Sequence, residues 1–236
     1  MKAEVAAPLA EVFVSLQGEG LWVGVSQIFV RVRGGELTCL YCDTAWAKQA
    51  TGERVTLGDL LVTVEARVAQ TPRLHSLALT GGEPLLYPEF ARGLGEALEE
   101  WGLPLYLETA GHLPEALAQV IPVTRYVALD YKLPSTLAKP VAMERFLESV
   151  AVASERALCV KIVVTDHTPE RELGEAACRL AEVNPRAPVV LQPVTGRSAA
   201  GGPPSLEQLL VWQALFAERV EEVRVIPQCH KRMGVR

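Results

Sequence analysis

The chain has 236 residues, of which 49% are hydrophobic and 22% charged, so it can bury a full core without disulfides or a partner. A net charge of -5 argues against an extended nucleic-acid surface, and no stretch approaches the roughly 18 apolar residues of a membrane span. The five cysteines are unevenly spaced and no apolar leader is apparent, which argues against a secreted disulfide framework. We therefore expect one cytoplasmic domain over residues 1–236 that acts on a small molecule, not on nucleic acid or a membrane.

Short β-branched runs alternate along the chain with longer stretches whose apolar residues repeat at helical spacing. The expected strands are residues 12–16, 27–33, 76–80, 104–108, 126–130, 158–165, 189–193 and 222–227. The expected helices are residues 56–70, 89–101, 113–120, 143–154, 169–183 and 205–218. This alternation is typical of an α/β fold with a parallel sheet, either open or partly closed into a barrel.

Polar or glycine-rich segments follow most of the expected strands. They are residues 17–20, 39–44, 80–84, 108–111, 130–132, 192–193 and 228–231. Sheets of this kind carry their chemistry at the carboxyl ends of the strands. We therefore expect these segments to line one shared pocket.

Cys39 and Cys42 can bind one metal ion or cluster, because the turn between them brings both sulfurs to the same side. A redox dithiol is less favoured, since such a motif should open a helix and here the chain continues as a loop. A structural zinc site would need further ligands. Cys229 and His230 could supply them only if the fold brings the C-terminal loop across.

A Thr-Gly-Gly-Glu-Pro segment follows the expected strand 76–80, where paired glycines let the backbone approach a ligand closely. Its combination with the preceding Cys-x-x-Cys loop resembles the radical S-adenosylmethionine (SAM) superfamily, whose fold is a partial (β/α)6 TIM-like barrel. Within that superfamily the chain is similar to the 7-carboxy-7-deazaguanine synthases. The matching segments are residues 15–20, 29–31, 42–44, 108–109, 191–193 and 228–231, which together span nearly the whole chain.

This resemblance implies a lyase of queuosine and deazapurine biosynthesis. A [4Fe-4S] cluster would reduce SAM to a 5'-deoxyadenosyl radical, which would abstract hydrogen from 6-carboxy-5,6,7,8-tetrahydropterin. The pterin would then contract its ring and lose ammonia to give 7-carboxy-7-deazaguanine. The resemblance also implies Mg²⁺, an electron donor such as flavodoxin or ferredoxin, and a homodimer.

The same resemblance implies roles for individual residues. Cys39 and Cys42 would be cluster ligands, and Thr44 would contact Mg²⁺ through its hydroxyl. The residues expected to bind the pterin are Leu16, Gln17, Gly18, Glu19, Arg31 and Thr80. The residues expected to bind SAM are Gly81, Gly82, Glu83, Asp130, Tyr131, Lys132, Gln192, Pro193, Val194 and Thr195. Arg31 has suitable chemistry, because a guanidinium pairs bidentately with a carboxylate.

One position departs from the superfamily pattern. The usual Cys-x3-Cys-x2-Cys spacing would place the first cluster ligand at Gly35, and no cysteine precedes Cys39. Cys159 and Cys178 are expected to be core thiols, whereas Cys229 falls at the correct end of the sheet. Three explanations remain open: an engineered or inactivated variant, a natural member with an atypical ligand, or a chain that kept the fold without the radical chemistry.

Two other functions remain open. The chain could be a non-catalytic zinc-binding protein on the same fold, or a radical enzyme with another substrate, such as an activase. Arg31 and residues 17–20 argue against the activase, because they suit a small carboxylated heterocycle. His75, His112 and His167 are not expected to be ligands.

Overall fold

The computed structural model describes residues 4–42, 47, 52–139 and 141–235, and its described strands form one sheet in the order β3-β1-β2-β4-β5-β6-β7-β8-β9. The strands are β1 (Ala6–Leu16), β2 (Ser26–Val32), β3 (Arg54–Thr56), β4 (Ser76–Gly81), β5 (Leu105–Thr109), β6 (Thr124–Tyr131), β7 (Ala157–Val164), β8 (Val189–Pro193) and β9 (Val223–Val225). The helices are α1 (Leu57–Gln70), α2 (Pro88–Glu100), α3 (Pro114–Val120), α4 (Met143–Ala153), α5 (Glu170–Val183), α6 (Leu206–Ala217) and α7 (Cys229–Met233).

The parallel prediction is confirmed for β2 and for β4 to β9, which pair in parallel with their neighbours. It is wrong at the N-terminal edge, where β1 pairs antiparallel with β2 and the unpredicted β3 pairs antiparallel with β1. The connection from β1 to β2 spans only residues 17–25. A parallel crossover needs about a dozen residues or more, so a connection of this length favours antiparallel pairing.

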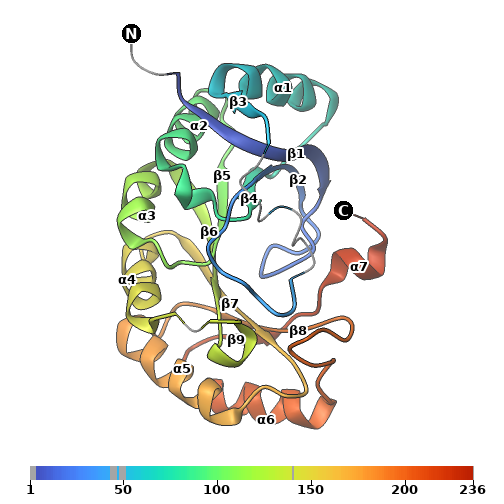
Figure 1. Ribbon diagram of the computed structural model, residues 1–236, viewed down its shortest axis with the longest axis vertical. Coiled ribbons are helices and arrows are strands. Elements are labelled where there is room, and N and C mark those ends of the chain that lie inside the picture. Colours follow the sequence, from blue (N-terminus) through green and yellow to red (C-terminus); the bar gives the residue numbers. More distant parts are fainter. Residues whose placement is uncertain (1–3, 43–46, 48–51, 140, 236) are drawn as a thin grey trace.

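Helices α1 to α6 form an arc along the outside of the sheet, whereas α7 lies on the opposite side, near the ends of β1 and β2 (Figure 1). The sheet is open, with β3 and β9 at its two edges. This arrangement, with helices on one face of a mainly parallel sheet, agrees with the predicted partial barrel.

Along the central strands, side chains point alternately into the core beneath the helices and toward the opposite face of the sheet. In β7, Val160, Ile162 and Val164 belong to the large core cluster beneath the helices. Lys161 and Val163, between them in sequence, face a cavity on the other side. Successive side chains of a strand point to opposite faces, so one apolar strand can serve both the core and a polar site.

The helix predictions hold to within a residue or two. α1 begins after Thr56, whose side chain accepts a hydrogen bond from the Asp59 backbone N–H, and α6 begins with a capping box between Ser205 and Gln208. The sequence patterns missed α7, where a loop was expected. Among the described helices, none has both the length and the apolar character needed to cross a membrane.

Candidate active site

A cavity of about 480 Å³ opens on the face of the sheet opposite the outer helices. Most strand-end segments contribute to it, as predicted for a sheet of this class. The predicted site residues that line the cavity are Leu16, Gln17, Gly18, Glu19, Arg31, Cys39, Cys42, Thr80, Gly81, Gly82, Glu83, Asp130, Lys132 and Gln192. Residues far apart in the sequence therefore share one pocket.

Four predicted residues do not line the cavity: Tyr131, Pro193, Val194 and Thr195. The Tyr131 ring packs against Phe146 of α4, with ring centroids 4.9 Å apart, because the alternation that turns Asp130 inward turns Tyr131 outward. A side-chain role for Tyr131 in ligand binding is therefore corrected to a core role. Thr44, the predicted magnesium contact, lies outside the described residues.

One set of polar contacts joins the loop after β1 to β4 and β5 in the cavity wall. Glu108 accepts hydrogen bonds from Gln17 Nε2 at 3.1 Å and from Thr80 Oγ1 at 2.8 Å. On the neighbouring strand β2, Arg31 Nε is 2.9 Å from Glu11 Oε1. These contacts hold the amide, hydroxyl and guanidinium groups in defined positions before any ligand arrives.

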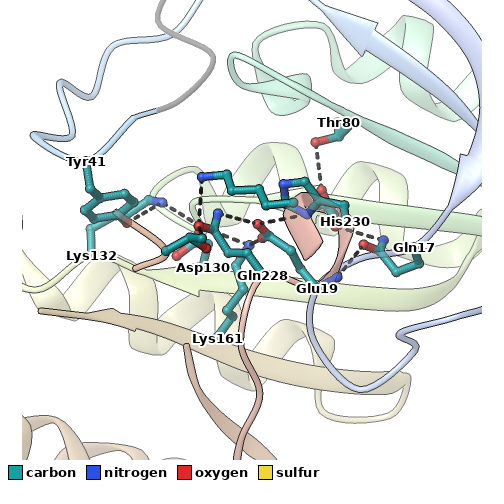
Figure 2. Close-up of polar contacts among 12 residues, drawn as sticks. Gln17, Glu19, Tyr41, Thr80, Asp130, Lys132, Lys161, Gln228 and His230 are labelled. Atoms are coloured by element: carbon teal, nitrogen blue, oxygen red, sulfur yellow. Dashed lines mark hydrogen bonds and ion pairs between the residues drawn. The ribbon is translucent and has the colours of Figure 1, made fainter. Parts of the chain in front are cut away.

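A second set of polar contacts links the loop between β1 and β2 (residues 17–25) to the central strands β6 and β7 (Figure 2). Lys161 Nζ lies 2.5 Å from Glu19 Oε2 and 3.4 Å from Asp130 Oδ2. Asp130 Oδ2 is in turn 2.6 Å from Lys132 Nζ, which donates to Tyr41 Oη at 3.0 Å. Tyr41 lies between Cys39 and Cys42 in the sequence. This chain of contacts therefore connects the loop that carries the two thiols (residues 39–42, the thiol loop) to β6 and β7.

The charges in this network stabilise one another. Burial raises the pKa of Glu19, but the Lys161 ammonium and the hydrogen bonds from Lys161, Gln228 and Gln192 outweigh it, so the pKa lies well below its ordinary range. Burial lowers the pKa of Lys161, and Asp130 and Glu19 raise it well above its ordinary value. Both groups are therefore ionised at neutral pH, as buried charges are when they are paired.

Several cavity residues were not assigned a site role from the sequence. Tyr41, Glu108, Gln228 and His230 lie in strand-end segments that were expected to line the pocket, whereas Glu11, His112 and Lys161 lie outside those segments. Lys161 carried a usable signal, since a lysine in the middle of an apolar strand is almost never buried without a partner. Gln228 and His230 reach the cavity through the unpredicted α7: Gln228 Nε2 donates to Glu19 Oε1 at 2.9 Å, and His230 Nδ1 lies 3.9 Å from the same oxygen.

The glycine pair Gly81-Gly82, at the end of β4, packs against the backbone of Val32 and Gly34. Gly81 has φ = 130°, in the region that favours glycine, and a Cβ on Gly82 would overlap the carbonyl oxygen of Gly34. The Glu83 backbone N–H donates to that same oxygen at 2.7 Å. The Glu83 carboxylate accepts from Thr109 Oγ1 and from the Ala110 backbone N–H, so it fastens this loop to the end of β5.

The thiols fit a three-thiolate cluster only in part. Cys39, Cys42 and Gly35 all line the cavity, and the Cys42 backbone N–H donates to the Cys39 carbonyl at 3.3 Å, which forms the expected turn. The other thiols are elsewhere: Cys159 is buried and Cys178 lies on the outer helix α5 against Arg219. Cys229 Sγ donates to the Pro227 carbonyl and is not among the lining residues.

The described cysteines therefore do not fit a three-thiolate [4Fe-4S] site. Nor, within the described ranges, do three or more His, Cys, Asp or Glu side chains converge in a way that could hold a single metal ion. This second finding removes support for the alternative of a zinc site formed by Cys39, Cys42, Cys229 and His230.

Residues 29–177 match the model of the radical SAM superfamily. The chain is 36% identical to a 7-carboxy-7-deazaguanine synthase of Geobacter sulfurreducens, with 97% of each chain covered. It is 34% identical to one of Methanothermobacter thermautotrophicus, with 98% of each covered. Among solved structures, the crystal structure of QueE from Escherichia coli superposes with a TM-score of 0.62 at 22% identity and covers 95% of each chain, which supports the fold.

Proposed function

This chain belongs to the 7-carboxy-7-deazaguanine synthase family of the radical SAM superfamily, and from that premise we propose that it converts 6-carboxy-5,6,7,8-tetrahydropterin to 7-carboxy-7-deazaguanine. The reaction contracts the pterin ring and releases ammonia, in queuosine and deazapurine biosynthesis. The observation that carries the proposal is that the polar residues expected to meet the pterin share one cavity with the thiol loop.

On the pterin side, this chain's residues supply recognition. Arg31 presents a guanidinium that Glu11 orients and that suits the substrate carboxylate. Gln17 and Thr80, held by Glu108, present an amide and a hydroxyl to the polar edge of the heterocycle. Glu19, fixed by Lys161, adds an ionised acceptor for ring N–H groups.

On the cofactor side, the Gly81-Gly82 backbone and the groups of Asp130, Lys132 and Gln192 are proposed to position SAM. Family members use a [4Fe-4S] cluster and SAM, and these cofactors carry the radical chemistry. The protein contributes placement and exclusion of water. Since only two thiols face the cavity, no step is assigned here through a three-thiolate cluster.

Several expectations accompany this function as proposals. The chain acts as a single domain in the cytoplasm, forms a homodimer and receives electrons from a flavodoxin or ferredoxin. Mg²⁺ bound through Thr44 completes the pterin site. The single cytoplasmic domain follows from the composition of the sequence, and the other expectations follow from its family resemblance.

The function is tested by anaerobic reconstitution with iron and sulfide, followed by addition of SAM, dithionite and the tetrahydropterin. The unaltered chain and Gly35→Cys are assayed in parallel for 5'-deoxyadenosine and 7-carboxy-7-deazaguanine. We expect the Gly35→Cys protein to form both 5'-deoxyadenosine and 7-carboxy-7-deazaguanine, and to do so only when the tetrahydropterin is present. A Gly35→Cys protein that carries a complete cluster and cleaves SAM, yet makes no deazaguanine, would contradict the proposed substrate.

Binding provides a test that does not depend on turnover. Arg31→Lys keeps the charge but loses the bidentate geometry, so we expect pterin affinity to fall about tenfold, the equivalent of one charge-assisted hydrogen bond. Anaerobic calorimetry measures the dissociation constant. Arg33→Lys is the matched control, because Arg33 lies just beyond β2 and does not line the cavity.

A further inference from the structure

Gly35 is not required by the backbone at its position. Its φ lies outside the left-handed region, unlike that of the neighbouring Gly34, whose φ is 95°. A Cβ added at Gly35 would lie 3.5 Å from the Cα and carbonyl carbon of Gly82, an ordinary van der Waals contact. The fold therefore accepts a side chain at the position of the missing thiolate, and the loss of this ligand is not a packing adaptation.

His112 is a mostly buried imidazole whose two ring nitrogens make no hydrogen bond to the described residues. It follows β5, lines the same cavity as Cys39 and Cys42, and its side chain is only 12% exposed. Neither of its ring nitrogens has a hydrogen-bond partner among the described residues. Buried polar atoms are nearly always satisfied in native structures, so an exception at a cavity wall indicates a ligand or an ion.

The surroundings of His112 place it beside position 35. Its Nε2 lies 3.4 Å from a carboxylate oxygen of Glu36, the residue that follows Gly35. Its Nδ1 lies 3.8 Å from a carboxylate oxygen of Glu83, the residue that follows Gly82. Since Gly35 packs against Gly82, the ring is bracketed by the two loops that meet at the missing ligand.

We propose that the imidazole of His112 replaces the missing thiolate, so that Cys39, Cys42 and His112 hold the iron–sulfur cluster of this chain. The inference rests on the proposed function and deepens it by naming the ligand set. Imidazole nitrogens are established iron ligands in iron–sulfur proteins, where they replace thiolates and raise the reduction potential. Glu36 or Glu83 would accept the proton of the second ring nitrogen and fix the ring, as carboxylates do for metal-bound histidines.

The lack, among the described residues, of three donors that could hold one metal ion does not test this assignment. A cluster binds each protein ligand at a different iron atom, so its ligands stand further apart than those of a single ion. A neutral imidazole in place of a thiolate also leaves the cluster less negative. We therefore expect its reduction potential to lie above that of the Gly35→Cys protein.

The test is a double-mutant cycle read by cluster content instead of activity. The unaltered chain, His112→Ala, Gly35→Cys and the double variant are reconstituted anaerobically with a phosphine reductant, so that no added thiol can serve as a ligand. Iron and sulfide per chain are then measured. We expect His112→Ala to lose most of the iron bound by the unaltered chain, whereas the same change in the Gly35→Cys background has little effect.

Pulsed EPR of the reduced cluster without SAM supplies a direct signature. The unaltered chain should show a nitrogen coupling that changes when histidine is labelled with ¹⁵N, and Gly35→Cys should lack it. His167→Ala is the control, because His167 is exposed and outside the cavity. This measurement needs no variant of His112. It therefore tests the proposal even if His112→Ala does not fold.

Three results would overturn the proposal. The unaltered chain could bind no cluster, it could keep its iron in His112→Ala, or its iron content could depend on added 2-mercaptoethanol and not on His112. The last result would show that an added thiolate, and not His112, is the third ligand of the cluster. A failure of the proposed function is distinguishable, since it would show as a Gly35→Cys protein with a complete cluster and no deazaguanine product.

Discussion

Lys161 is the residue on which the polar network of the cavity depends. It is a lysine in the middle of β7, 7% exposed, with Glu19 and Asp130 as its counter-charges. The arrangement is stable because each charge has a partner and hydrogen bonds. Removing one member leaves the others buried and uncompensated, which costs far more than the loss of a surface ion pair.

We expect Glu19→Gln to lower the free energy of unfolding at pH 7 by about 3 kcal/mol, the size typical of a broken buried pair. The pKa of Glu19 lies below its ordinary value of 4.5 in the folded state. Its contribution is thus present above pH 4.5 and is lost as the pH falls through the folded-state pKa. Urea unfolding at pH 7, 5 and 3.5 should show the difference from the unaltered chain shrinking only in the most acidic sample.

The control for this prediction is Glu96→Gln. Glu96 pairs with Arg92 on the exposed face of α2, where both side chains are more than half exposed, so its removal should change stability little at any of these pH values. A Glu19→Gln protein as stable as the unaltered chain at pH 7 would show that Asp130 alone neutralises Lys161.

At the scale of elements, the ends of β2 and β4 are joined by backbone contacts that require glycine. The Gly82 N–H donates to the Val32 carbonyl at 3.0 Å and the Glu83 N–H donates to the Gly34 carbonyl at 2.7 Å. These contacts place the thiol loop beside the loop proposed to meet SAM. Side chains could not achieve the same close approach, because a Cβ at Gly82 would overlap Gly34.

We expect Gly82→Ala to lower the free energy of unfolding by about 1–3 kcal/mol, the usual cost of forcing extra atoms into a packed site. Its cluster content should fall as well, since the two loops must separate. Gly35→Ala is the matched variant, because its added Cβ makes only ordinary contacts. Thermal unfolding and iron analysis of both proteins check the prediction, and equal effects at the two glycines would contradict it.

At the scale of the whole molecule, the loop after β1 and the C-terminal α7 meet at the cavity. The Cys229 backbone N–H donates to the Gly18 carbonyl at 2.8 Å, and a Cβ on Gly18 would overlap the His230 side chain. α7 lies on the side of the sheet opposite the outer helices (Figure 1), where its His230 lines the cavity. Gln228 and His230 reach Glu19 only because of this docking.

We expect a chain that stops after Pro227 to bind the tetrahydropterin several-fold more weakly while its melting temperature changes by only a few degrees. The reason is that α7 contributes polar groups to the cavity but no buried residue. Calorimetry and thermal unfolding measure the two effects. Arg232→Ala, an exposed change in α7, is the control, and unchanged affinity in the truncated chain would show that α7 is not part of the site.

Local sequence patterns were enough to predict the α/β class, the positions of the six outer helices and most of the residues that line the cavity. These features follow from local periodicity and from the rule that polar segments after parallel strands share one edge. The resemblance of the sequence also implies that Gly35 stands where the superfamily pattern has its first cluster cysteine.

The partners that those residues meet, in contrast, depend on how distant parts of the chain pack together. Lys161 pairs with Glu19 across 142 positions of sequence, and Gln228 reaches Glu19 across 209, separations that no local pattern encodes. The outward turn of Tyr131 and the antiparallel pairing of β1 likewise depend on sheet register. His112 became a candidate ligand for the same reason: its burial, its lack of a hydrogen bond and its place beside Gly35 are properties of packing.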